Sequence, residues 1–306
     1  MVTVAEVADP EDLSHLHEIA RRVARLPAAE RLRYVRADRW IGYTRASQAL
    51  AKLETLLAHP KRERMPNLLL LGATNNGKSM IIEKFRRAHP PISHPEREEV
   101  PVLVVQMPSD PKVARFYAAV LTALGAPLRP SMRLAELEQL TLCLLRAAGV
   151  RMLVIDELHN TLAGHGNARR EFLNLLRFLG NELKIPLVGV GTQEAYLAIR
   201  SDDQLENRFT PFALPRWQPG GEACQLLASF AASFPLRVPS QIATVEMAEY
   251  LLARSEGTIG ELAALLTEAS VAAIESGSES INQRTLLMAD YAGPTERRRL
   301  FERELT

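Results

Sequence analysis

The stretch LLLLGATNNGKSMIIEKF, residues 68–85, predicts a buried strand, a turn and a helix in direct succession. Its turn matches the pattern G-x-x-x-x-G-K-[ST] at every fixed position. The residues of the match are Gly72, Ala73, Thr74, Asn75, Asn76, Gly77, Lys78 and Ser79. Glycine at both ends lets successive N–H groups turn toward one anion, and the following helix adds its positive N-terminus. We therefore expect a loop that binds nucleotide phosphates, with Met80 as its last contact.

A second motif supplies the acidic half of the expected site. The segment GVRMLVIDELHN, residues 149–160, is an apolar strand that ends in Asp156 and Glu157. Carboxylates at the end of a buried strand are costly unless they serve a cation. We expect Lys78 to reach the β- and γ-phosphates of ATP, and Ser79 and Asp156 to bind Mg²⁺. Glu157 is then the general base that orients the attacking water.

Apolar runs that alternate with helical patterns indicate the fold class. The runs are 67–71, 102–107, 152–155, 185–190 and 209–214, of which the last is weakened by Pro211. Near-continuous apolar runs suit strands that are buried on both faces. This alternation predicts an α/β fold with a parallel sheet between two helical layers, of the P-loop type.

The chain divides at breaker-rich segments. Residues 1–39 read as an N-terminal helical arm outside the main core, and 40–218 as the nucleotide-binding α/β domain. The segment PRWQPGGE, 215–222, marks a boundary, beyond which only helical patterns occur. We expect a small helical lid domain over 219–292 and a charged tail over 293–306.

Composition limits the other classes of function. The 306 residues carry 37 Lys and Arg against 36 Asp and Glu, so total charge neither proposes nor excludes a nucleic-acid partner. The two cysteines predict no disulfide framework and fit a reducing compartment. No apolar run approaches the ~18 residues of a membrane span. The start is acidic and does not resemble a secretory signal, so we expect a cytoplasmic protein without membrane contact.

Two further positions carry open alternatives. Thr192 ends the strand of IPLVGVGTQEA and either contacts the γ-phosphate or water, or caps the next helix. Arg208 precedes the last strand in DDQLENRFTPF. It either reaches the γ-phosphate of a neighbouring subunit as an arginine finger, or forms a surface salt bridge.

Taken together, these motifs resemble the TniB/TnsC-like family of AAA+ ATPases, which regulate bacterial transposition. The resemblance rests on GATNNGKS, VIDELHN, VGVGTQ, ENRF, RADRWIGYTRA and EGTIGELAALLTEA, and it covers roughly residues 30–290. It implies assembly with ATP on double-stranded DNA, as rings or filaments with roughly six subunits per turn. It also implies recruitment of a DDE-type transposase and a target-selection protein, and disassembly on ATP hydrolysis.

The resemblance also suggests further contacts. Residues that correspond to DNA-contacting segments are Lys112, Arg115, Arg129 and Arg133. Trp40 and Tyr43 precede the phosphate loop as adenine-contacting residues do in relatives, although core packing explains them equally well. Relatives can carry a γ-phosphate-sensing arginine where this chain has Glu261, which puts in doubt how tightly lid closure follows the nucleotide.

Two other functions fit part of the pattern. A helicase loader or initiator-like AAA+ ATPase shares the same chemistry with different partners. A nucleotide-gated DNA scaffold would bind ATP with little turnover; the presence of Glu157 argues against it, and Glu261 in the sensor position favours it.

Overall fold

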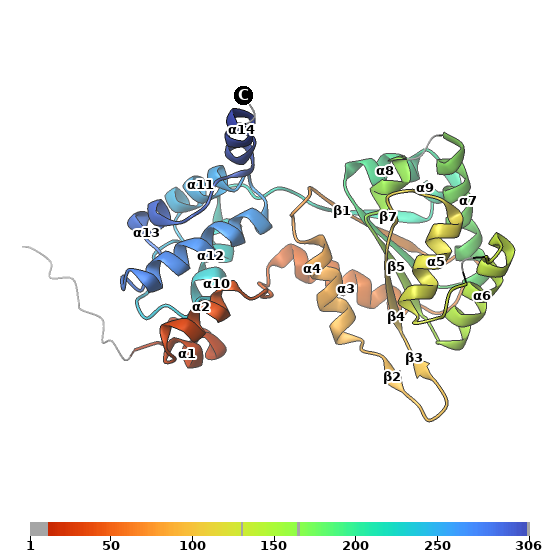
Figure 1. Ribbon diagram of the computed structural model, residues 1–306, viewed down its shortest axis with the longest axis horizontal. Helices are drawn as coiled ribbons and strands as arrows, with labels where there is room; N and C mark the ends of the chain where they lie inside the picture. The colour runs from red at the N-terminus through yellow and green to blue at the C-terminus, as the bar shows by residue number, and fades with distance from the viewer. Residues whose placement is uncertain (1–11, 130, 164–165, 305–306) are drawn as a thin grey trace, which may run out of the picture. The chain divides into compact units, whose positions relative to one another are not determined.

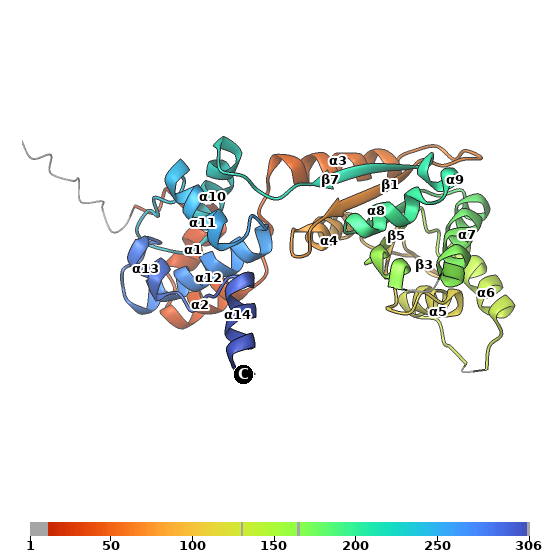
Figure 2. The same cartoon turned by 90° about the horizontal axis from the view of Figure 1, so that it is seen from above.

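The computed structural model describes residues 12–129, 131–163 and 166–304. The chain forms two compact units, seen in Figures 1 and 2. The sheet unit is Thr44–Pro215, and the helical unit combines residues 12–43 with residues 216–304. Each unit has its own apolar core, and each is described by itself below.

A five-stranded parallel sheet forms the centre of the sheet unit. Its strand order is β4-β5-β6-β1-β7. The strands are β1 (Asn67–Gly72), β4 (Val102–Gln106), β5 (Met152–Asp156), β6 (Leu187–Gly191) and β7 (Phe209–Leu214). Their carboxyl ends share one edge of the sheet, because every neighbouring pair is parallel. The predicted parallel α/β fold is confirmed.

Strand β7 forms despite Pro211. It pairs with β1 along its whole length, from Asn67 opposite Phe209 to Gly72 opposite Leu214. Because β7 is an edge strand, the missing N–H of proline does not interrupt a ladder on a second side. The fifth predicted strand is therefore present, and Pro211 is accommodated because β7 lies at the side of the sheet.

Helices cover both faces of the sheet. Figure 1 shows α3 and α4 on one side and α5, α7 and α8 on the other. The helices of this unit are α3 (Thr44–Leu57), α4 (Lys78–Ala88), α5 (Val113–Ala123), α6 (Leu134–Ala147), α7 (Gly166–Leu183), α8 (Gln193–Arg200) and α9 (Asp203–Glu206). Alternate strand residues such as Leu69, Leu153 and Leu187 pack into one buried cluster with side chains of α5 to α9. The three-layer arrangement follows from this period of two.

Two short elements were not predicted. Strands β2 (Ile92–Ser93) and β3 (Glu98–Glu99) form a small antiparallel hairpin between α4 and β4. A 3-10 helix, η1 (Leu158–Ala163), directly follows the acidic end of β5.

The helical unit has seven helices among its described residues. They are α1 (Glu18–Ala24), α2 (Ala28–Arg36), α10 (Gly221–Ser233), α11 (Val245–Arg254), α12 (Ile259–Glu275), α13 (Gln283–Met288) and α14 (Pro294–Glu304). Val35 and Ile41 lie in the same apolar cluster as Leu262 and Phe230. Residues before the sheet unit therefore complete the core of the helical unit.

A buried ion pair joins the two halves of the helical unit. The guanidinium of Arg31, in α2, is 2% exposed and pairs with Glu279, which lies 248 positions later in the chain. The same group donates hydrogen bonds to the carbonyl of Pro235 at 2.8 and 3.0 Å. Each nitrogen of the buried guanidinium thus has a partner, which offsets part of its desolvation cost.

The observed division differs from the predicted one. The predicted arm, 1–39, lies within the helical unit from residue 12 onward, and residues 40–43 join it there; residues 1–11 lie outside the described residues. The predicted tail, 293–306, contains helix α14, while residues 305–306 lie outside the described residues. Helical periodicity indicates that a segment is a helix but does not say which part of the chain the helix packs against.

Within the described residues, no single helix is long and apolar enough to cross a membrane. The pair α11 and α12 passes the same test of length and composition only when taken together, with a bend of 104° between them.

Candidate active site

The loop from β1 to α4 adopts the backbone that a phosphate site requires. Gly77, directly before α4, has φ 81°, in the left-handed region that glycine enters without a steric penalty. Asn75 also lies in that region, at φ 58°. Such a sequence of backbone angles turns N–H groups inward into an anion-binding concavity at the helix N-terminus.

Two contacts fix the loop against the neighbouring strand β7. The side-chain amide of Asn76 is buried and donates to the carbonyls of Leu214 at 2.9 Å and Pro215 at 3.1 Å. A Cβ on Gly72 would lie 3.2 Å from the carbonyl oxygen of Leu214, so a side chain there would push the loop and β7 apart by a few tenths of an ångström. The side chain of Asn76, predicted as a nucleotide contact, therefore holds the loop in place.

Lys78 lies inside the loop. Its Nζ donates to the carbonyl oxygens of Gly72 at 2.9 Å and Ala73 at 2.7 Å. The residue is 6% exposed, and this burial lowers the pKa of its ammonium group. The carboxylates of Glu157 and Asp156 act in the opposite direction and favour the charged form. The loop thus holds a cation against its own carbonyl oxygens, within the electrostatic influence of the two carboxylates after β5.

Ser79 and Asp156 meet although 77 positions separate them. The Ser79 hydroxyl, in the first turn of α4, donates to Oδ2 of Asp156 at 2.9 Å. Asp156 is the last residue of β5, at the same sheet edge as the end of β1. One hydroxyl and one carboxylate fit Mg²⁺, which keeps several waters and takes its other ligands from nucleotide phosphates.

Glu157 has a partner that the sequence interpretation missed. His159 Nε2 lies 3.1 Å from Oε2 of Glu157, and both belong to the turn after β5. Glu157 has φ 56°, which is uncommon for a residue with a side chain and occurs often at functional sites. The position of His159 two residues after the predicted base was the available signal. Its Nδ1 is buried without a hydrogen-bond partner among the described residues.

Thr192 lies at the same sheet edge, at the end of β6. It occupies the N-cap position of α8, but its hydroxyl bonds the carboxylate of Glu194 and makes no side-chain cap hydrogen bond. This hydrogen bond is the main reason that the pKa of Glu194 is lowered. Because β6 lies between β5 and β1, Thr192 belongs to the same polar group as Asp156 and Lys78.

Arg208 lies where the strands begin, at the end of the sheet opposite the phosphate loop. It directly precedes β7, and its carbonyl accepts from the N–H of Asn67 at the start of β1. Its Nη1 donates to the side-chain oxygen of Asn181, in α7, at 2.9 Å. Within the described ranges Arg208 forms no ion pair with a carboxylate, so the alternative of a surface salt bridge is not what the structure shows.

The two predicted adenine contacts belong to the helical unit. Tyr43 packs edge-on against Trp217, with ring centroids 5.2 Å apart. Burial raises the pKa of the Tyr43 hydroxyl to about 12. Trp40 lies beside Gly42, with its indole nitrogen 3.6 Å from where a Cβ of that glycine would be. Tyr43 therefore has a packing role, and contact with adenine stays a prediction for both.

The four predicted DNA-contacting residues are all exposed. Asp110 pairs with Lys112 at 3.0 Å and lies 3.6 Å from Arg115, and these cations lower the pKa of its carboxyl. Arg129 and Arg133 lie in the connection before α6, and neither forms an ion pair with another described residue. DNA binding by these residues stays a prediction.

Glu261, which occupies the expected sensor position, has a structural role in the helical unit. It is 8% exposed, and its carboxylate accepts from Arg297 at 2.6 Å and from the Tyr291 hydroxyl at 3.0 Å. Arg297 lies on α14. The carboxylate therefore anchors the C-terminal helix.

Several solved structures share the fold of this chain at low sequence identity. In fold, the chain is similar to the ORC2 protein of Aeropyrum pernix in ADPNP-ADP complexes, at 13% identity and TM-score 0.58, covering 83% of this chain and 69% of that one. It is also similar to Aeropyrum pernix ORC1 in complex with DNA, at 15% identity and TM-score 0.54, covering 84% and 68%. The RuvB branch-migration motor of Thermotoga maritima matches at 17% identity and TM-score 0.50, covering 83% and 72%.

No curated protein matches the sequence. The family model described as "Bacterial TniB protein" matches residues 31–219, which is more than half of the chain. That range contains the phosphate loop, the acidic end of β5 and Arg208. The structure adds the AAA+ type of fold, with a parallel sheet and a helical region after it. This chain therefore belongs to the TniB family.

Proposed function

We propose that this TniB protein is a Mg²⁺-dependent ATPase that assembles on double-stranded DNA with ATP and disassembles on hydrolysis. In the assembled state it recruits a DDE-type transposase and a target-selection protein. The observation that carries the proposal is the Ser79–Asp156 hydrogen bond beside the buried Lys78. Lys78 and Ser79 begin α4 and Asp156 ends β5, and the carboxylate of Asp156 favours the charged form of Lys78.

The roles of the side chains follow from their positions. The loop N–H groups and Lys78 bind the phosphates, and Ser79 with Asp156 holds the metal. Bound Mg²⁺ would neutralise charge that develops on the phosphate oxygens. Glu157, one residue beyond Asp156, accepts a proton from the attacking water, and His159 positions its carboxylate. Thr192 contacts the γ-phosphate or the water from the adjacent strand.

Two substitutions test the ATP chemistry. Lys78→Ala removes the buried cation, and we expect loss of ATP binding and of ATP-dependent assembly on DNA. Glu157→Gln keeps the shape of the base, and we expect ATP binding with turnover lowered at least ~100-fold and assemblies that persist on DNA. Lys84→Ala, an exposed site on the same helix, is the matched control with unchanged behaviour. Undiminished filaments in Lys78→Ala would refute the proposal.

Electron microscopy with double-stranded DNA separates assembly from hydrolysis. We expect rings or filaments with ATP or a non-hydrolysable analogue and none with ADP. Equal assembly with all three nucleotides would contradict control by the γ-phosphate. Co-sedimentation of the transposase and the target-selection protein with these assemblies, absent with ADP, tests recruitment.

A nucleotide-gated scaffold with little turnover is the second candidate. The contact between Glu157 and His159 favours it, because a carboxylate engaged by imidazole is less available to water. Turnover by the DNA-bound wild type that equals that of Glu157→Gln would select the scaffold, and a faster wild type would select the ATPase.

A further inference from the structure

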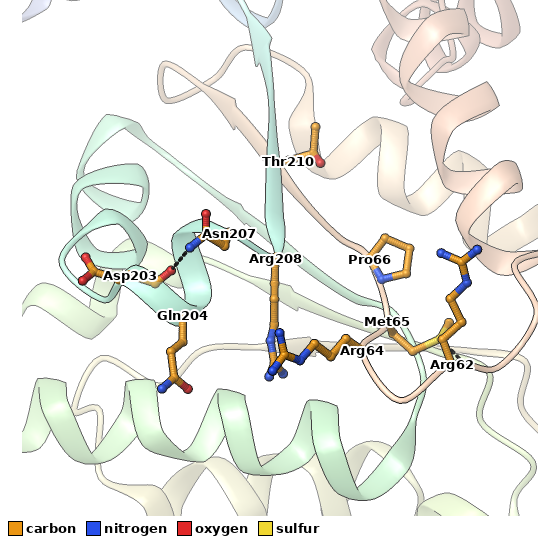
Figure 3. Close-up of a pocket in the computed structure, with 9 residues that line it drawn as sticks. All are labelled: Arg62, Arg64, Met65, Pro66, Asp203, Gln204, Asn207, Arg208 and Thr210. Carbon is orange, nitrogen blue, oxygen red and sulfur yellow. Dashed lines mark hydrogen bonds between the residues drawn. The ribbon is translucent and has the colours of Figure 1, made fainter.

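A second polar pocket lies at the amino-terminal ends of the strands, opposite the phosphate loop. It has a volume of about 500 Å³ and lies where β1 and β7 begin (Figure 3). The lining residues come from the segment before β1 and from α9 to the start of β7; they are Arg62, Arg64, Met65, Pro66, Asp203, Gln204, Asn207, Arg208 and Thr210. Three of these nine side chains are guanidinium groups.

The positive charge of the pocket is not balanced by its own residues. Asp203 is the only acidic residue of the lining, and Figure 3 shows its carboxylate pointing away from the arginines. Among the described residues, Arg62, Arg64 and Arg208 form no ion pair with a carboxylate. The partner of Arg208 is the neutral amide of Asn181, which orients the guanidinium without neutralising it. An oxyanion is the ligand that such a pocket fits.

The pocket is held in shape by the chain around it. Met65 is 4% exposed, and its sulfur accepts from the N–H of Arg62 at 3.2 Å, which closes the turn that carries Arg62 and Arg64. The N–H of Asn67 donates to the carbonyl of Arg208 at 2.9 Å and ties this turn to β7. The three arginines are thus attached to the rigid start of two paired strands.

The oxyanion is not the nucleotide of the same subunit. Asn67 pairs with Phe209 where β1 and β7 begin, and Gly72 pairs with Leu214 where they end. The two ends of the strands are five residues apart, or about 17 Å at ~3.3 Å per residue. This distance exceeds the reach of an arginine side chain. A chain with a phosphate loop at one edge and uncompensated arginines at the opposite edge is suited to head-to-tail assembly, the geometry of rings and helical filaments.

We infer that Arg62 and Arg64 join Arg208 in a three-arginine receptor for the terminal phosphate of ATP bound to a second copy of this chain. The inference rests on the proposed ATPase function. It adds two residues from the turn before β1 to the single arginine of the ENRF segment. Three guanidinium groups bind more of the oxygens of one phosphate than a single group does, and the charge they neutralise is largest in the transition state.

Subunit mixing with the full chain tests action in trans. Arg62→Ala/Arg64→Ala has an intact base but a defective receptor, while Glu157→Gln has an intact receptor but no base. With ATP and double-stranded DNA, we expect each alone to turn over at least ~10-fold slower than wild type. An equimolar mixture should recover about a quarter of wild-type turnover, since half the subunits keep the base and half of those have an intact neighbour. Lys61→Ala, in the same exposed turn outside the pocket, is the matched control and should match wild type.

Each result decides the inference. A double variant with wild-type turnover, while Arg208→Ala is slow, would overturn the receptor and leave the ATPase function intact. No recovery in the mixture would overturn action in trans. Weaker DNA binding without nucleotide, with a smaller salt slope, would assign the arginines to DNA phosphates instead. Arg62→Lys/Arg64→Lys keeps the charge, so reduced turnover there supports the receptor even if the alanine variant does not fold. A wild type without ATPase activity would be a failure of the proposed function.

Discussion

At the residue scale, Lys78 carries its charge in a buried position, where the charged form is disfavoured. Burial lowers the pKa of its ammonium group in the folded chain, so the charged form is less favoured there than in the unfolded chain. The resulting destabilisation is present at all pH values below the folded pKa and disappears as pH rises above the unfolded value, near 10.5. Binding chemistry, not stability, therefore explains this lysine.

Lys78→Met should stabilise the nucleotide-free protein. The change removes the buried charge and keeps the apolar stem, so we expect unfolding at pH 7 to cost on the order of 1 kcal/mol more. Urea denaturation at pH 7 and pH 10.5 measures this, and the gain should shrink at the higher pH. A less stable variant at pH 7 would show that the hydrogen bonds to Gly72 and Ala73 outweigh burial.

His159→Ala should slow hydrolysis without changing ATP affinity. Loss of the imidazole frees the carboxylate of Glu157 to occupy several rotamers, and we expect kcat to fall about 10-fold. Steady-state turnover and fluorescent-nucleotide binding measure the two effects. The matched control is His94→Ala, because His94 also lies near a glutamate, Glu99 at 3.4 Å, but in the β2–β3 hairpin. A rise in kcat would instead identify the contact as a brake, as the scaffold alternative requires.

At the scale of elements, helix α14 buries little of its surface. Its outward side chains Leu300 and Phe301 are 47% and 62% exposed. Arg297 bonds Glu261, and the N–H of Thr295 donates to Glu256 at 2.8 Å. These polar contacts at its first turns anchor the helix more than apolar burial does.

Arg297→Ala should therefore loosen α14 selectively. It leaves the carboxylate of Glu261 without its main partner, and we expect at least a ~10-fold faster amide exchange over 294–304. Hydrogen–deuterium exchange measures this, with Arg299→Ala on the same helix as control. Unchanged exchange would show that other contacts hold the helix.

How far the sequence predicts an element depends on where its contacts come from. The strands β1, β4, β5 and β6 were predictable, because each is an apolar run that can be recognised from its own few residues. The packing of α14 was not, because its charged sequence is stabilised by Glu261, more than thirty positions away. In the site, Lys78, Ser79 and Asp156 follow from motif spacing, whereas the Glu157–His159 contact depends on the backbone of a turn with positive φ.

At the scale of the whole molecule, near-neutral charge conceals local basic clusters. The net charge is +1, yet Arg129 and Arg133 flank one connection without ion pairs among the described residues. Asp110 partly offsets Lys112 and Arg115 at the start of α5. DNA affinity is therefore expected from specific loops repeated in an assembly.

Substitution of Arg129 and Arg133 by alanine should weaken DNA binding uniformly across sequences. Each lost phosphate contact should reduce the slope of log K against log salt by about 0.9. Fluorescence anisotropy over a salt series with ATP measures this, and Arg22→Ala, paired with Glu18 on α1, is the control. An unchanged slope would exclude these loops from the DNA interface.

The Arg31–Glu279 ion pair has a consequence for synthesis on the ribosome. Its partners are 248 positions apart, and the complete sheet unit lies between them in the chain. All strands of that unit are translated before Glu279. The sheet unit is therefore able to fold first, while Val35 and Ile41 still lack their core partners, which come later in the chain. The first part of the helical unit to be made is thus among the last to be buried, so its apolar side chains stay exposed for most of translation.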